Sequence, residues 1–246
     1  MNTLGIIPAR YASSRLEGKP LADIKGKSMI QRVYERAVGE VTHLIVATDD
    51  DRIYDHVKSF GGNVVMTSSN HTTGTNRCLE AWQKLEIDIV FDVIINIQGD
   101  EPLLAKEHLQ DITSCFDDPN TEMATLVKTI DKGVNLAISS NVYVVLDNNS
   151  EALYFSRSII PALRDYPIEE WTNHHTFYKH IGMYAFKPNS LERFAWLKST
   201  SLELAESLEQ NRWLQNGNKI KVAVTSKDVI AVDTPEDLES VRRLFD

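Results

Sequence analysis

The sequence is short of cysteine, of long apolar runs and of positive charge, and each shortage argues against a class of protein. Its two cysteines, Cys78 and Cys115, lie far apart and form no CxxC pair. We expect both to be reduced thiols in a cytoplasmic protein. No apolar run approaches the roughly 20 residues that span a bilayer, and the first residues lack the basic and apolar regions of a secretory signal. Membrane insertion is therefore not expected.

The charge balance is acidic, with 26 Lys and Arg against 35 Asp and Glu and a net charge of −9. Nonspecific nucleic-acid binding depends on an excess of basic residues, so nucleic acid is not an expected partner. Two nucleotide-binding signatures are also missing, because the sequence has neither a Walker A loop nor a GxGxxG motif after its first apolar run. An anionic ligand of this chain therefore needs a local cluster of cations.

The order of apolar and amphipathic segments predicts an α/β fold. Strand-like runs alternate with helix-like stretches in the first hundred residues, which is typical of a mostly parallel sheet with helices on both faces. From 122 to 187 strand-like runs follow one another without helices, which indicates an antiparallel insertion within one domain of residues 1–246. Helices are expected again over 190–197 and 201–217, then a strand over 228–233. A last helix should begin at Thr234, with Pro235 in its first turn and Asp237 at N3.

Charged residues follow the predicted strands at the ends where an open parallel sheet binds ligands. Arg10, Arg15 and Lys19 come after the first strand, among the small residues Ala12, Ser13, Ser14 and Gly18. Small residues leave backbone N–H groups accessible, and together with fixed cations they suit a polyphosphate. A solvated basic loop is the simpler alternative.

Two aspartates are candidates for a Mg²⁺ site. Asp100 ends the fourth strand in "NIQGDEP", and Asp233 lies in "AVDTPED". Magnesium takes one or two carboxylates and completes its shell with phosphate oxygens and water. Capping of the last helix is the structural alternative for Asp233, but Thr234 already suits that position.

The motifs together carry a family resemblance. The segments "IIPARYASSRLEGKPL", "MTSSNHTTGTNRC", "NIQGDEP", "ALYFSRSIIP", "YKHIGMYAF" and "VDTPEDLESVR" resemble, in order, those of the 3-deoxy-manno-octulosonate (Kdo) cytidylyltransferases, the CMP-Kdo synthetases. The resemblance implies a nucleotidyltransferase-type fold and the reaction of CTP with Kdo to CMP-Kdo and pyrophosphate, for lipopolysaccharide inner-core synthesis. It also implies Mg²⁺ dependence and a homodimer, in which residues 122–187 contribute to sugar binding and dimerisation.

The resemblance assigns roles to particular residues. Arg10, Lys19, Asp100 and Asp233 are expected to carry the catalysis, the two aspartates as metal ligands. The CTP site is expected to comprise Ala9, Arg10, Arg15, Lys19, Thr73, Gly74, Thr75 and Gln98. The sugar-acid site is expected to comprise Arg157, Arg164, His180, Tyr184, Glu209 and Gln210. Without the resemblance, an arginine such as Arg157 or a histidine such as His180 is more often structural.

The chain departs from the family pattern at Glu17, Asn76, Ser139, Ser140 and Tyr143. The family often has a lysine where Tyr143 stands, so the sugar site is expected to be less cationic, and an 8-amino analogue of Kdo is an alternative substrate. A sialic acid is a second alternative, although its cytidylyltransferases usually carry a different first loop. A nucleotide-binding protein without turnover is a third, which the retention of both aspartates disfavours.

Overall fold

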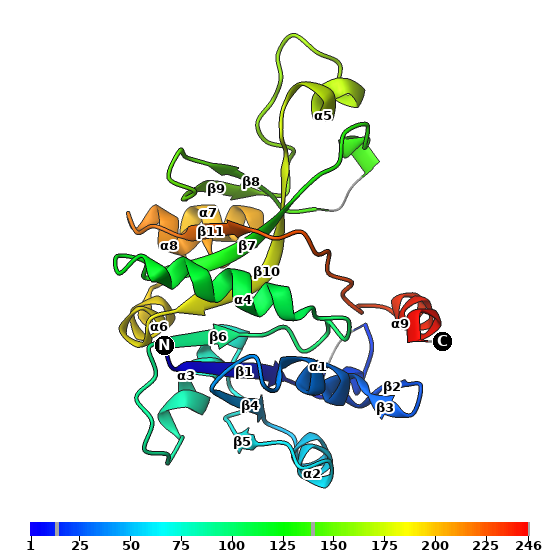
Figure 1. The fold of residues 1–246 in the computed structure, drawn as a ribbon, viewed down its shortest axis with the longest axis vertical. Helices are drawn as coiled ribbons and strands as arrows, with labels where there is room; N and C mark the ends of the chain where they lie inside the picture. The colour runs from blue at the N-terminus through cyan, green and yellow to red at the C-terminus, as the bar shows by residue number, and fades with distance from the viewer. Residues whose placement is uncertain (13–14, 139–140, 246) are drawn as a thin grey trace. The chain divides into compact units, whose positions relative to one another are not determined.

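The computed structural model describes residues 1–12, 15–138 and 141–245, and it divides into two compact units (Figure 1). The first unit comprises 1–110, 185–195 and the chain from 229 onward, and the second comprises 111–184 and 196–228. Ser13, Ser14, Ser139 and Ser140, which the sequence singled out, lie outside the described residues.

The first unit is built on parallel strands in the order β6-β1-β4-β5. Ile6 of β1 is in register with Ile45 of β4 on one side and with Asn96 of β6 on the other. The strands are β1 (Thr3–Ala9), β4 (His43–Thr48), β5 (Val64–Met66) and β6 (Val93–Asn96), and a separate hairpin pairs β2 (Asp23–Ile24) with β3 (Lys27–Ser28). Because β1 lies between β6 and β4, its C-terminal end opens on the middle of this unit's ligand-binding edge.

Side-chain caps set the starts of the first two helices of this unit. Ser28 accepts a hydrogen bond from Gln31 N, Asp50 accepts one from Arg52 N, and Gly61 follows the second helix with a positive φ of 80°. The helices are α1 (Met29–Ala37), α2 (Asp51–Ser59), α3 (Gly74–Gln83), α6 (Pro188–Trp196) and α9 (Pro235–Arg242), with α4 (Lys106–Ser114) running into the second unit. The α/β prediction is confirmed.

The second unit holds the predicted antiparallel insertion. Strand β8 pairs antiparallel with β9 and with β10, whereas β11 and β7 are parallel. An arm that carries the short helix α5 (Trp171–His174) extends beyond β8 and β9 (Figure 1). The strands are β7 (Met123–Thr129), β8 (Tyr143–Leu146), β9 (Ala152–Ser156), β10 (Tyr178–Phe186) and β11 (Lys221–Val224).

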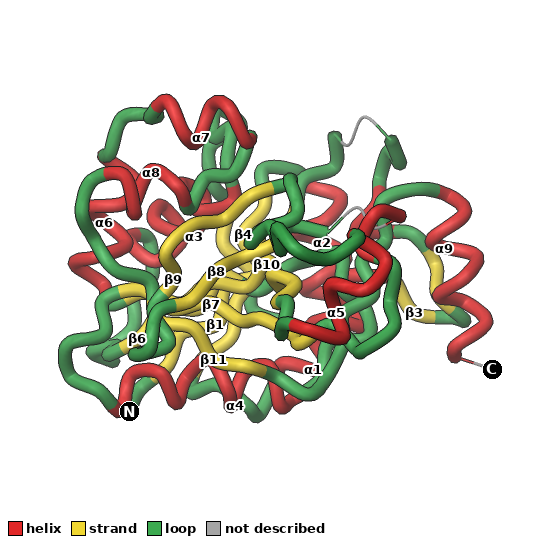
Figure 2. The backbone as a smooth tube through the Cα atoms, turned by 90° about the horizontal axis from the view of Figure 1, so that it is seen from above, coloured by secondary structure: helices red, strands yellow, loops and turns green. Residues whose placement is uncertain are grey.

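Two sequence predictions of secondary structure are wrong. The stretch 201–217 forms two helices, α7 (Ser201–Glu206) and α8 (Asn211–Gln215), which lie side by side (Figure 2). The break falls at Ser207, whose left-handed φ of 53° ends α7. The stretch 228–233 is not a strand: it runs past the end of β6, and Val232 N donates to Asp100 O at 2.9 Å.

Helix α9 closes a small core of the first unit. Val232, Leu238 and Val241 pack with Ile24 and Met29, all of them buried. The helix begins with the predicted capping box, in which the Thr234 hydroxyl accepts from Asp237 N and the Asp237 carboxylate accepts from Thr234 N. The same carboxylate accepts from Asp233 N at 3.0 Å, so the cap also fixes the backbone of the candidate metal ligand. No helix in the described part of the chain is both long and apolar enough to cross a membrane.

Replacing Thr234 tests the cap. Thr234→Ala should lower the free energy of unfolding by about 1 kcal/mol, because Asp237 N loses its acceptor, whereas Thr234→Ser should keep most of it. Urea denaturation of the two variants beside the parent protein measures this. Equal midpoints for Ala and Ser would contradict the role of the hydroxyl.

Candidate active site

A cavity of about 370 Å³ opens at the C-terminal ends of β1 and β6 in the first unit. Its walls contain most of the residues predicted to bind the nucleotide and the metal. The lining residues are Pro8, Ala9, Arg10, Ala12, Arg15, Lys19, Pro20, Thr73, Gly74, Arg77, Gln98, Gly99, Asp100 and Asp233. Thr75, the remaining residue of the predicted nucleotide set, is buried in α3 and is not among them.

The Lys19 ammonium joins the two candidate metal ligands. Its Nζ lies 2.7 Å from Asp100 Oδ2 and 3.3 Å from Asp233 Oδ1, and it donates to Val232 O at 3.0 Å. An ammonium has three N–H donors, so these contacts use all of them. The Lys19 side chain keeps only 16% of its surface exposed. Two carboxylates that are 133 residues apart in the sequence therefore converge on one cation.

The other two cations of the basic cluster differ in their contacts. Arg15 Nη2 lies 3.0 Å from Asp233 Oδ1, and its side chain is 63% exposed. Arg10 is exposed on the cavity wall, and among the described residues it has no hydrogen-bond or ion-pair partner. Within this cluster the cavity wall thus carries three cations and two carboxylates, which leaves an excess of one positive charge for an anionic ligand.

The loop that carries these cations is closed on itself next to α2. Gly18 N donates to Tyr11 O at 3.0 Å, and Gly18 has a φ of 66°, which favours glycine. A Cβ at this position would lie 3.1 Å from Tyr11 Cζ. The Arg52 guanidinium covers the Tyr11 ring at 3.2 Å and is itself bound through two nitrogens to Asp50. The positions of Tyr11 and Gly18 are therefore set by packing against the unit.

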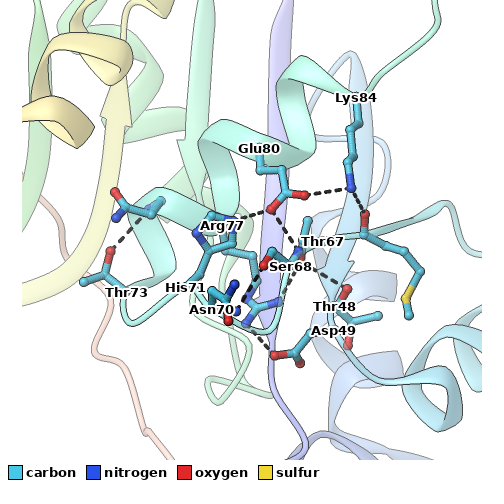
Figure 3. Close-up of polar contacts among 12 residues, drawn as sticks. Thr48, Asp49, Thr67, Ser68, Asn70, His71, Thr73, Arg77, Glu80 and Lys84 are labelled. Atoms are coloured by element: carbon cyan, nitrogen blue, oxygen red, sulfur yellow. Dashed lines mark hydrogen bonds and ion pairs between the residues drawn. The ribbon is translucent and has the colours of Figure 1, made fainter.

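Arg77 is a cavity residue that the sequence analysis missed (Figure 3). Its side chain is 1% exposed, with Nη1 2.6 Å from Thr67 Oγ1 and Nη2 2.9 Å from Asp49 Oδ2. The signal was available, because an arginine on the buried face of α3, beside Cys78 and Ala81, is a charge placed inside the protein.

Glu80 anchors the loop between β5 and α3. Its carboxylate accepts from Ser68 N at 2.9 Å, pairs with Lys84 at 2.7 Å, and contacts His71 Nε2 (Figure 3). Burial by itself would raise the pKa of Glu80, but the bonds from Lys84, Ser68 and His71 outweigh burial and lower this pKa to about 2. This loop leads into Thr73, which caps α3 by accepting from Asn76 N.

The predicted sugar-acid residues lie in the second unit. His180 Nε2 is 3.0 Å from Thr125 Oγ1, and its ring packs against Phe155 and Tyr184. Burial lowers the pKa of His180 to about 3, so the ring is neutral at physiological pH. Burial, and then the charge of Glu209, raise the pKa of Tyr184.

The remaining members of this set have other surroundings. Arg157 donates from Nε to Glu206 O at 2.7 Å and from Nη2 to Ser207 O, so it binds the C-terminal carbonyls of α7. Gln210 is 3% exposed, and its Nε2 has no hydrogen-bond partner among the described residues. Arg164 is exposed, and the structure shows no contact that brings it to the others in the described part of this unit.

Tyr143, where the family often has lysine, is fully buried. It packs with Leu136 and Phe177, and its hydroxyl donates to Leu136 O at 3.2 Å. The departure thus replaces a charge with a satisfied core residue. Asn76, a second departure, has a buried Oδ1 with no hydrogen-bond partner in the part of the chain that the structure describes.

Comparisons with known proteins agree along the length of the chain. A family model described as Cytidylyltransferase matches residues 4–220. The 3-deoxy-manno-octulosonate cytidylyltransferase of Parabacteroides distasonis is 55% identical over 243 residues, which is 97% of this chain and 96% of the relative. That of Bacteroides thetaiotaomicron is 53% identical over 242 residues, 97% and 96% of the two chains. A solved CMP:2-keto-3-deoxy-manno-octonic acid synthetase complexed with CTP superimposes with a TM-score of 0.90 at 41% identity, covering 100% of this chain and 98% of that one.

Acid titration tests the Glu80 network. A carboxyl with a lowered folded pKa stabilises the fold above its unfolded pKa of about 4.5 and loses that contribution as the pH falls toward 2. At pH 7 we expect Glu80→Gln to be less stable than the parent by about 2 kcal/mol, with the difference shrinking between pH 4.5 and 3. Urea denaturation at several pH values measures it.

The matched control is Glu86→Gln, at an exposed position just after the same helix. It should show no comparable difference at any pH. A Glu80→Gln difference that stays constant from pH 7 to pH 3 would contradict the lowered pKa.

Proposed function

The chain belongs to the cytidylyltransferase family, and on that premise we propose that it transfers CMP from CTP to the anomeric hydroxyl of Kdo and releases pyrophosphate. The observation that carries the proposal is the 55% identity to a Kdo cytidylyltransferase over 97% of this chain. The cavity supports it, because cations and carboxylates from the ends of β1 and β6 meet where a nucleotide triphosphate and a metal need them.

The cations of the cavity hold the triphosphate. Arg10 is ready to bind phosphate oxygens, whereas Arg15 and Lys19 are paired with carboxylates until the nucleotide enters. A triphosphate brings more negative charge than Asp100 and Asp233 together, so it competes for both cations. Guanidinium groups also match phosphate geometry through paired N–H donors. Together these residues orient the chain of phosphates and stabilise pyrophosphate as it leaves.

Asp100 and Asp233 fit a divalent cation, and Mg²⁺ suits them best. The structure already places both carboxylates against one positive charge, the Lys19 ammonium. No group of three or more His, Cys, Asp or Glu side chains in the described residues could hold a metal, so phosphate oxygens and water have to complete the shell, as Mg²⁺ prefers. When bound, the ion supplies positive charge that offsets the repulsion between the anionic sugar and the α-phosphate.

The transfer needs no protein nucleophile. The anomeric hydroxyl of the sugar loses its proton to water as its oxygen bonds to the α-phosphorus, the bond from that phosphorus to the bridging oxygen breaks, and pyrophosphate departs. The chain contributes positioning and charge neutralisation, through Lys19 and Arg10 on the phosphates and through the two aspartates.

The second unit supplies the sugar-acid site in this proposal. Arg157 and Arg164 are its candidate partners for the sugar carboxylate. His180 contributes a neutral ring, with Tyr184, Glu209 and Gln210 nearby in the fold of that unit. The protein acts in the cytoplasm as a homodimer and provides the activated sugar for lipopolysaccharide. Kdo is the proposed acceptor, and 8-amino-Kdo and a sialic acid are the acceptors to compare with it.

Pyrophosphate release from CTP and Mg²⁺, with each of the three acceptors in turn, tests the proposal. We expect turnover with Kdo, and a fall of kcat by at least about 100-fold in Asp100→Asn and in Asp233→Asn, because each change removes a carboxylate that holds the cation at the reacting phosphate. Asp55→Asn, an exposed site on α2, is the matched control and should leave the rate unchanged. Full activity of either cavity variant, or turnover with a sialic acid only, would refute the proposal.

A further inference from the structure

Arg77 is a buried cation with more hydrogen-bond donors than the protein uses. A guanidinium has five N–H donors. Among the described residues, the side chain donates to Thr67 Oγ1 and to Asp49 Oδ2. The side chain is 1% exposed, so bulk water reaches almost none of it. The open space that Arg77 borders is the nucleotide cavity, so N–H groups beyond these two contacts are placed to donate to a ligand there.

The guanidinium is held rigidly at one end of that cavity. Asp49 follows β4 and Thr67 follows β5, and the Thr67 hydroxyl in turn donates to Thr48 O at 3.1 Å. The strand order β6-β1-β4-β5 puts these two strand ends on one side of β1, whereas Asp100 follows β6 on the other side. The phosphate-binding groups therefore gather with Asp100, and Arg77 lies toward the opposite end.

A rigid group that only donates discriminates between pyrimidine bases. Cytosine presents two neighbouring acceptors, N3 and O2, whereas uracil presents a donor, N3–H, in place of the first. A guanidinium edge satisfies both acceptors of cytosine and meets the N3–H of uracil donor to donor. Sites that hydrogen-bond a substrate group discriminate strongly against an analogue lacking it, because their own buried polar groups are left unpaired.

We propose that Arg77, oriented by Asp49 and Thr67, donates to the N3/O2 edge of the nucleobase and sets the preference for CTP over UTP. The inference rests on the proposed function, since it assigns the nucleotide to this cavity. Contact of Arg77 with the ribose or the phosphates is the competing possibility, and it would lower the affinity for CTP and UTP alike.

The test compares kcat/KM for CTP and for UTP, with Kdo as acceptor, in the parent protein, Arg77→Lys and Arg77→Met. We expect the CTP:UTP ratio to fall at least about tenfold in both variants. Asp49→Asn keeps the guanidinium but loosens its support, and should lower the ratio less. Gln83→Ala, at an exposed site on the same helix, is the control and should keep the parent ratio.

Calorimetric binding of CMP and of UMP to the same variants gives a readout that does not need turnover. If the parent protein does not turn over CTP with any of the sugar acids, the proposed function fails. If the parent prefers CTP but the Arg77 variants keep its ratio, in turnover or in CMP:UMP binding, the inference about Arg77 alone is overturned. An equal loss for both nucleotides, with or without a lower melting temperature, assigns Arg77 a structural or phosphate-binding role and also overturns it. Should both Arg77 variants fail to fold, the ratio in Asp49→Asn decides, and a parent-like value there refutes the inference.

Discussion

The candidate site depends on one interaction, the contact of the Lys19 ammonium with Asp100 and Asp233. The two carboxylates are far apart in the sequence. They meet because Asp100 follows β6 and the segment 228–233 runs past the end of that strand. Lys19 offsets the mutual repulsion of the two carboxylates, and Arg15 adds a second positive charge beside Asp233. In the proposed function, the phosphates of the nucleotide compete for Lys19, and the two carboxylates would then hold the metal.

Sequence patterns were sufficient wherever local chemistry decides the structure. The capping box at Thr234, with Pro235 in the first turn and Asp237 at N3, is a short-range feature, and it was predicted correctly. The cluster at the strand ends was also predictable, since the carboxyl ends of parallel strands meet at one edge. What the pattern could not give was the identity of each partner, such as the pairing of Lys19 with carboxylates.

The misses come from tertiary contacts that no local pattern encodes. An apolar period continues through 201–217, yet Ser207 takes a left-handed conformation and Arg157 binds the carbonyls of the helix end. The apolar stretch 228–233 has the composition of a strand, but its backbone bonds to Asp100 rather than to a ladder. Arg77 lies within the segment "MTSSNHTTGTNRC", which carries part of the family resemblance. Only the structure shows that its side chain is buried against Asp49 and Thr67.

Calorimetry of CTP binding with and without Mg²⁺ tests the central claim most directly, because it measures whether the two carboxylates join metal to nucleotide. The account predicts that Mg²⁺ tightens CTP binding to the parent protein and that Asp100→Asn combined with Asp233→Asn abolishes this tightening. Equal tightening in the parent and in the double variant would show that the metal does not bind at these carboxylates, and would contradict the account.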